Sequence, residues 1–171
     1  MDFISHSLKK IKPSPTMVIT AKARELRAAG EKIISLSAGE PDFDTPEHVK
    51  DAAIKAINMG YTKYTNVEGI PELKQAIVNK FKNDNEIDYN TDQVIVGVGG
   101  KQILFNALFA SLNTEDEVII PTPYWVSYPD MTILAGGIPK FLNCSEENDF
   151  KINPSELDNV ISEKTKWIIL N

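Results

Sequence analysis

The chain has 171 residues, of which 42% are hydrophobic and 25% are charged. These fractions are typical of a folded, water-soluble protein of about one domain, and they exclude disordered and fibrous chains. The formal net charge of −6 repels the phosphates of nucleic acids and anionic lipid surfaces, so we expect neither nucleic acid nor a membrane as a partner.

The first part of the chain combines helical segments with polar loops. Apolar residues at helical spacing, with proline or glycine at the segment ends, predict helices over residues 16–29, 47–58 and 71–83. A short β-branched stretch over 32–37 alternates apolar and polar residues, which predicts a strand.

Strands and helices alternate in the rest of the chain. Strands are predicted over 93–98, 117–120, 139–143 and 166–170, and helices over 100–112, 126–135 and 154–161. Apolar runs within these strands indicate burial on both faces. We therefore predict an α/β fold in three layers, with a mostly parallel sheet, helices on both of its faces, and ligands at the carboxyl ends of the strands.

An anion site is indicated where the strand over 93–98 runs through glycines into a helix. The sequence Val-Gly-Val-Gly-Gly-Lys-Gln at 96–102 lets backbone amides approach an anion at a helix N-terminus. Ile95 and Gln102 replace residues that the Walker pattern requires, and Gln102 also replaces the third glycine of the dinucleotide fingerprint. A mononucleotide-like group or a single phosphate is a better match than ATP or NAD, and a purely structural glycine turn is the alternative.

Three more positions have the chemistry of a small-molecule site. Trp125 follows the strand over 117–120 and offers a flat face for stacking on an aromatic ring, unless it only fills the core under a loop. Gly39 could bring backbone amides close to a carboxylate, and the Tyr64 hydroxyl could bond a phosphate oxygen. For Gly39 and Tyr64, ordinary turn chemistry is the alternative.

Four segments together resemble a known family. They are Leu-Ser-Ala-Gly-Glu-Pro-Asp-Phe-Asp-Thr-Pro at 36–46, Tyr-Thr-Asn-Val-Glu-Gly-Ile-Pro-Glu-Leu at 64–73, Val-Gly-Gly-Lys-Gln at 98–102 and Pro-Tyr-Trp-Val-Ser-Tyr-Pro at 123–129. In order and spacing they resemble the N-terminal part of the class I, fold-type I pyridoxal-phosphate aminotransferases. The resemblance is strongest to the bacterial aspartate and aspartate/prephenate branch, and it covers nearly the whole chain.

The resemblance implies pyridoxal 5'-phosphate as the cofactor. It implies that the backbone at Gly99, Gly100 and Lys101 holds the cofactor phosphate. It also implies that Trp125 stacks on the pyridine ring and contacts the substrate. Tyr64 is expected to reach across a homodimer interface to the partner's phosphate, so that the two active sites are shared.

The resemblance also implies the substrates. The expected reaction moves an amino group between aspartate or glutamate and a 2-oxo acid, which is oxaloacetate, 2-oxoglutarate or prephenate. The Gly39 backbone is expected to bind the substrate α-carboxylate. The ammonium groups of Lys101 and Lys12 are expected to recognise the distal carboxylate.

The lysine that forms a Schiff base with the cofactor in this family is expected beyond Asn171, so we assign no catalytic residue within the chain. We expect residues 1–45 to form an N-terminal arm and the first part of a small domain. Residues 46–171 are expected to form the first part of an aminotransferase-like large domain, which is incomplete here. The alternatives are a non-catalytic truncated fragment or split-gene product of such an enzyme, and an aminotransferase of alanine, aromatic or kynurenine specificity.

The cysteines and histidines of the chain indicate its cellular compartment and whether it has a metal site. Cys144 is the single cysteine and has no internal disulfide partner, so we expect a cytoplasmic protein. His6 and His48 lie far apart with no cysteine beside them, so we expect no metal site.

Overall fold

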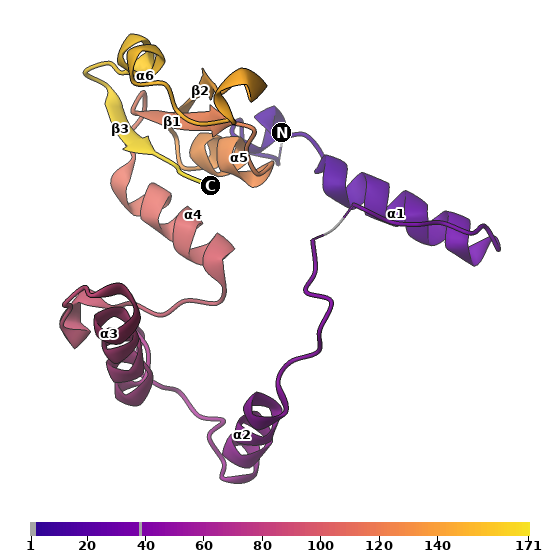
Figure 1. The fold of residues 1–171 in the computed structure, drawn as a ribbon, viewed down its shortest axis with the longest axis vertical. Helices are drawn as coiled ribbons and strands as arrows, with labels where there is room; N and C mark the ends of the chain where they lie inside the picture. The colour runs from indigo at the N-terminus through magenta and orange to yellow at the C-terminus, as the bar shows by residue number, and fades with distance from the viewer. Residues whose placement is uncertain (1–2, 38) are drawn as a thin grey trace. The chain divides into compact units, whose positions relative to one another are not determined.

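The computed structural model describes residues 3–37 and 39–171. The chain divides into two compact units. We call them the sheet unit, which is Met1–Ala38 with Lys101–Asn171, and the helical unit, which is Gly39–Gly100. Figure 1 follows the elements along the chain. Within the described ranges, every helix falls short of the length and apolar character that crossing a bilayer requires.

The sheet unit is built on three parallel strands. β1 (Glu117–Thr122) is the central strand, with β2 (Ile138–Asn143) on one side and β3 (Thr165–Ile168) on the other. Parallel neighbours need a crossover connection, and the two crossovers contain α5 (Ser127–Leu134) and α6 (Pro154–Val160). A 3-10 turn, η3 (Glu146–Asn148), precedes α6. The α/β class and the parallel sheet predicted from the sequence are confirmed over these strands.

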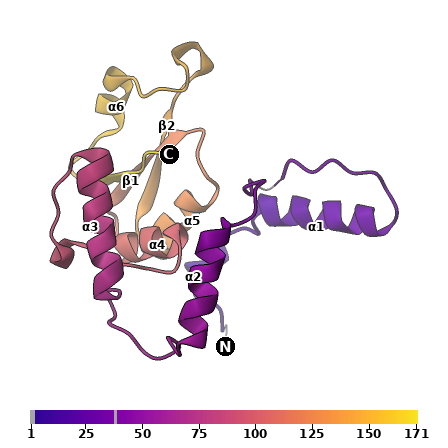
Figure 2. The same ribbon diagram turned by 60° about the horizontal axis from the view of Figure 1, so that its bottom comes forward.

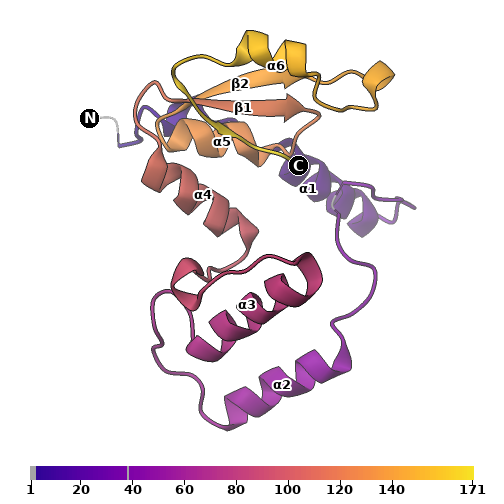
Figure 3. The same ribbon diagram turned by 60° about the vertical axis from the view of Figure 1, so that its left-hand side comes forward.

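Helices cover both faces of this sheet, as Figure 3 shows. Successive residues of a strand face opposite sides. In β1, Val118 and Ile120 pack in the cluster formed with α4 (Gly100–Ser111) and α5, whereas Ile119 packs in the cluster that includes α6. All three side chains are fully buried. Burial of such a side chain stabilises the fold by roughly 1.5–3 kcal/mol, so β1 is the best-anchored strand.

The N-terminal part of the sheet unit contains a 3-10 turn, η1 (Leu8–Lys10), and a helix, α1 (Pro15–Ala28). The strand predicted over 32–37 is wrong, because this segment is not paired with any strand in the described chain. Its polar contacts run to α1 instead: Arg27 donates to the Ile33 carbonyl oxygen, and the hydroxyls of Thr20 and Ser37 lie 3.1 Å apart. A β-branched pattern forms a strand only where a neighbour completes the ladder.

The helical unit contains α2 (Glu47–Asn58), α3 (Pro71–Asn85) and a 3-10 turn, η2 (Thr91–Gln93). Figure 2 shows the loop that joins α2 to α3. The strand predicted over 93–98 is wrong, since η2 takes its first residue and the rest is irregular. The Val96 N–H donates to the carbonyl oxygen of Glu68 in the loop at 2.9 Å, rather than to a neighbouring strand.

A close contact joins the loop before α3 to this irregular segment. Gly69 has a φ of +111°, and a Cβ at this position would lie 2.7 Å from Cγ2 of Val96. Next to this contact, the buried side chain of Lys74 places Nζ 3.8 Å from Oε1 of Glu68. Only glycine fits at position 69 without displacing Val96, so the contact fixes how the loop lies on the segment.

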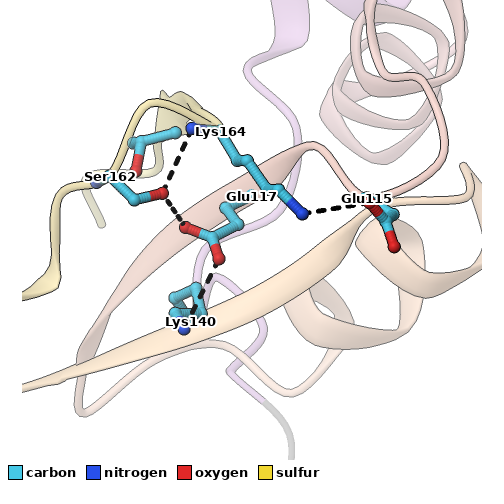
Figure 4. Close-up of polar contacts among 6 residues, drawn as sticks. Glu115, Glu117, Lys140, Ser162 and Lys164 are labelled. Carbon is cyan, nitrogen blue, oxygen red and sulfur yellow. Dashed lines mark hydrogen bonds and ion pairs between the residues drawn. The ribbon is translucent and has the colours of Figure 1, made fainter.

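The amino end of β1 carries a buried carboxylate, shown in Figure 4. Glu117 is 8% exposed. It accepts a hydrogen bond from Oγ of Ser162 at 2.6 Å and lies 3.5 Å from Nζ of Lys140. The Ser162 hydrogen bond, helped by the charge of Lys140, outweighs the opposing effect of burial and lowers the pKa of Glu117. The exposed pair of Lys164 with Glu115 lies close by.

Replacing Gly69 with alanine should lower the free energy of unfolding by about 2–4 kcal/mol, because the new methyl group is strained at positive φ and overlaps Val96. Gly60 is a matched control, since its φ is +81° but nothing lies within 4 Å of a Cβ there. Gly60→Ala should cost only about 1–2 kcal/mol. Urea unfolding measures both values, and equal losses would contradict the role of the Val96 contact.

Replacing Glu117 with glutamine should destabilise the protein near neutral pH and reduce its acid sensitivity. A depressed folded-state pKa means that the carboxylate stabilises fully above its ordinary pKa of 4.5. This stabilisation is lost as the pH falls through the lower folded-state value. Urea titrations at several pH values should show the difference between wild type and variant shrinking below pH 4.5. Glu115→Gln, at an exposed pair, is the control, and the same pH dependence in both variants would contradict this account.

Candidate functional site

The glycine turn that begins α4 has an open backbone. Gly99 has a φ of +80°, and nothing lies within 4 Å of a Cβ built at Gly99 or Gly100. The Gly99 amide donates to the Gly97 carbonyl at 3.0 Å. Gly100 and Lys101 are the first two residues of α4, where amides have no acceptor within the helix. The turn therefore has space beside it, and the amides of Gly100 and Lys101 are donors that an anion could use. The phosphate role expected for Gly99, Gly100 and Lys101 stays a prediction.

Lys101 and Trp125 lie together in the sheet unit. Nζ of Lys101 lies 4.7 Å from the centroid of the Trp125 ring, which is the geometry of a cation–π contact. Trp125 is 37% exposed, so its ring is not simply core filling. Among the described residues no carboxylate forms an ion pair with Lys101. The ammonium is therefore held by an indole face and is available to a ligand carboxylate.

Residues 123–126, which we call the Trp125 loop, follow β1, and hydrogen bonds at Thr122 anchor the start of this loop. Oγ1 of Thr122 donates to Oδ1 of Asn143 at 3.2 Å and accepts from the Cys144 N–H at 3.3 Å. These bonds tie the carboxyl end of β1 to that of β2. The loop therefore leaves the sheet at the edge where parallel α/β sheets bind ligands.

Two residues near Trp125 were missed by sequence reasoning. The rings of Tyr128 and Trp125 meet edge to face, with centroids 5.5 Å apart. The Tyr128 hydroxyl donates to Oδ1 of Asn171 at 2.7 Å. The spacing of three between Trp125 and Tyr128, at the start of a predicted helix, is a signal that could have linked them. The partnership with Asn171 has no signal in the sequence.

The other predicted site residues are described each within its own unit. Gly39 and Tyr64 belong to the helical unit, where both are exposed. Lys12 is exposed between η1 and α1 and forms no ion pair with the described residues. The roles expected for these three residues stay predictions. In the part of the chain that the structure covers, no group of three or more histidine, cysteine, aspartate or glutamate side chains could hold a metal ion.

Comparisons with known proteins connect this geometry to a family. The family model of aminotransferase class I and II matches residues 31–171. Over 171 residues the chain is 58% identical to the probable aspartate/prephenate aminotransferase of Rickettsia bellii (strain RML369-C). This match covers 100% of the chain and 43% of that protein. The chain is 57% identical to the aspartate/prephenate aminotransferase of Cereibacter sphaeroides (strain ATCC 17029 / ATH 2.4.9), with the same coverage.

A solved structure gives the same answer. Aspartate aminotransferase from Thermus thermophilus with maleate superposes with a TM-score of 0.95 at 45% identity, over 99% of this chain and 44% of that one. The chain thus spans less than half the length of the relatives it matches. Because the family model covers most of its residues, the chain belongs to the class I and II aminotransferases, in the aspartate/prephenate branch.

Proposed function

We propose that the protein to which this chain belongs transfers an amino group between aspartate or glutamate and a 2-oxo acid, with pyridoxal phosphate as cofactor. The acceptor would be oxaloacetate, 2-oxoglutarate or prephenate. The contact of Lys101 with Trp125 carries the proposal, because it places a cation, which pairs with no carboxylate among the described residues, on a ring suited to stacking. The names of the relatives support the same chemistry.

The residues present fit the phosphate of this cofactor. The open space at Gly99 and Gly100 and the amides that begin α4 suit a phosphate group. The face of Trp125 would hold the pyridine ring. Pyridoxal phosphate, when bound, supplies an aldehyde that accepts the amino group and a ring that withdraws electrons from the substrate α-carbon.

The chain's own residues would bind and orient the substrate. Lys101 would hold the distal carboxylate of an acidic substrate by a charge-assisted hydrogen bond. Lys12 would contribute a second cation, and the Gly39 backbone would bind the α-carboxylate. Trp125 would shield one side of the reacting centre from water, which strengthens the electrostatic contacts there. The base that moves the substrate proton is expected beyond Asn171.

We also propose a homodimer with shared sites. The side chain of Tyr64 is fully exposed, as is Val67 in the same loop, which suits a loop that contacts a partner. Residues 1–45 would belong to an arm and a small domain. The exposed apolar side chains of Ile34 and Leu36 are consistent with a domain completed by further residues. The single, buried Cys144 agrees with the cytoplasm as the compartment.

The whole protein should bind pyridoxal phosphate, absorb visible light and transfer the amino group of aspartate to 2-oxoglutarate. Cofactor binding is read from the visible absorbance, and transfer from the oxaloacetate produced. Borohydride, which reduces the bond between enzyme lysine and cofactor, should abolish the activity. A protein that binds the cofactor without transferring amino groups would refute the enzymatic part of the proposal, and one that does neither would refute all of it.

Replacing Lys101 with methionine should raise the KM for aspartate and glutamate about ten- to a hundredfold, since a hydrogen bond to a charged group contributes about 1.5–3 kcal/mol. The KM for alanine, which has no distal carboxylate, should change much less. Lys12→Met, tested in parallel, measures how much the second proposed cation contributes to the KM for the acidic substrates. If Lys101→Met changed the KM for acidic and neutral substrates equally, Lys101 would have no role in selecting acidic substrates.

A further inference from the structure

Tyr128 occupies an unusual place among the aromatic residues near the site. It is 8% exposed and packs in the core cluster between α4, α5 and the sheet. Its ring meets Trp125 edge to face, at an interplanar angle of 84°. Its hydroxyl donates to Oδ1 of Asn171 at 2.7 Å. One side chain thus contacts the ring predicted to stack on a cofactor and a residue three positions after the end of β3.

The hydrogen bond with Asn171 spans two separate elements. Tyr128 is the second residue of α5, and Asn171 lies 43 positions later in the chain. A buried tyrosine hydroxyl needs a partner, and an amide oxygen on a different element fixes the direction of the ring. Because the two rings pack against each other nearly at right angles, fixing Tyr128 also restricts how Trp125 can turn.

Lys101 also contacts the Trp125 ring. The ammonium lies 4.7 Å from the indole centroid, and this contact alone would leave the ring free to move with a flexible lysine side chain. Tyr128, by contrast, is buried and hydrogen-bonded. The rigid contact is therefore the one with Tyr128.

We infer that Tyr128 is a positioning residue, which Asn171 holds by a hydrogen bond and which in turn fixes the plane of the Trp125 ring. The inference rests on the proposed function insofar as that ring stacks on the cofactor. Removing either end of the hydrogen bond should loosen the indole and weaken cofactor binding, without removing any group that touches the cofactor.

The test uses the whole protein in a Trp167→Phe background, so that Trp125 is the only tryptophan that the chain of 171 residues contributes; any tryptophan beyond Asn171 would also be replaced. Tyr128→Phe should lower the near-ultraviolet circular dichroism of the indole and raise its quenching by acrylamide in the cofactor-free protein. The Kd for pyridoxal phosphate should rise about three- to tenfold, the range for loss of one neutral hydrogen bond.

Asn171 supplies a paired test. Asn171→Leu should reproduce the effects of Tyr128→Phe, and the double variant should be no worse than either single variant, because both break the same bond. Asn171→Asp keeps an acceptor oxygen and should restore most of the indole signal. Additive effects, or the same loss in Asn171→Asp as in Asn171→Leu, would overturn the inference.

Thr132→Val is the control for a merely structural effect. Its buried hydroxyl donates to the Tyr128 carbonyl at 2.9 Å within α5, so this variant should lower stability and leave the indole signal in place. An indole signal that follows stability in all variants would overturn the inference. The indole is read without cofactor, so a protein that fails to bind pyridoxal phosphate would refute the proposed function and leave this test intact.

Discussion

The parallel pairing of β1 with a strand on each side is the interaction on which the candidate site depends. Glu117 to Ile120 are all buried, because helices cover both faces and neighbouring strands cover both edges. A parallel arrangement forces all three strands to end at the same side of the sheet. The Trp125 loop after β1 and Asn171 after β3 therefore come together there, although they are far apart in the sequence.

The two ends of β1 differ in chemistry. The carboxylate of Glu117 lies at its amino end, and the aromatic side chains of the Trp125 loop follow its carboxyl end.

The sequence predicted the helices well and the isolated strands poorly, for one physical reason. A helix closes its hydrogen bonds within the segment, so the local pattern of residues 47–58 is sufficient to define α2. A strand needs a partner whose identity the local pattern does not contain. The segments over 117–120, 139–143 and 166–170 have partners in this chain and form strands. The segments over 32–37 and 93–98 have equally suitable residues, and they bond to α1 and to the Glu68 loop instead.

The candidate site was predictable to a similar, limited degree. The glycine turn at Gly99 was readable because glycines before a helix leave the backbone open to an anion, and Trp125 was readable from its place after a predicted strand. The cation–π contact of Lys101 with Trp125 depends on how the start of α4 lies beside the loop after β1, which no local pattern encodes. The hydrogen bond from Tyr128 to Asn171 is still less accessible, since it spans 43 positions and neither residue type signals the other.

The position of Lys101 would let an acidic protein bind the acidic substrate that we propose for it. The net charge of −6 describes the field far from the surface, and ions in solution screen that field beyond about 8–10 Å. At contact distance the nearest charge decides, and at this site it is an ammonium on an indole face. In exposed pairs such as Lys164 with Glu115 a carboxylate neutralises the cation. Lys101 has an aromatic partner instead, and within residues 3–37 and 39–171 no carboxylate pairs with it. A carboxylate that approaches Trp125 therefore meets an unneutralised cation whatever the overall charge of the chain.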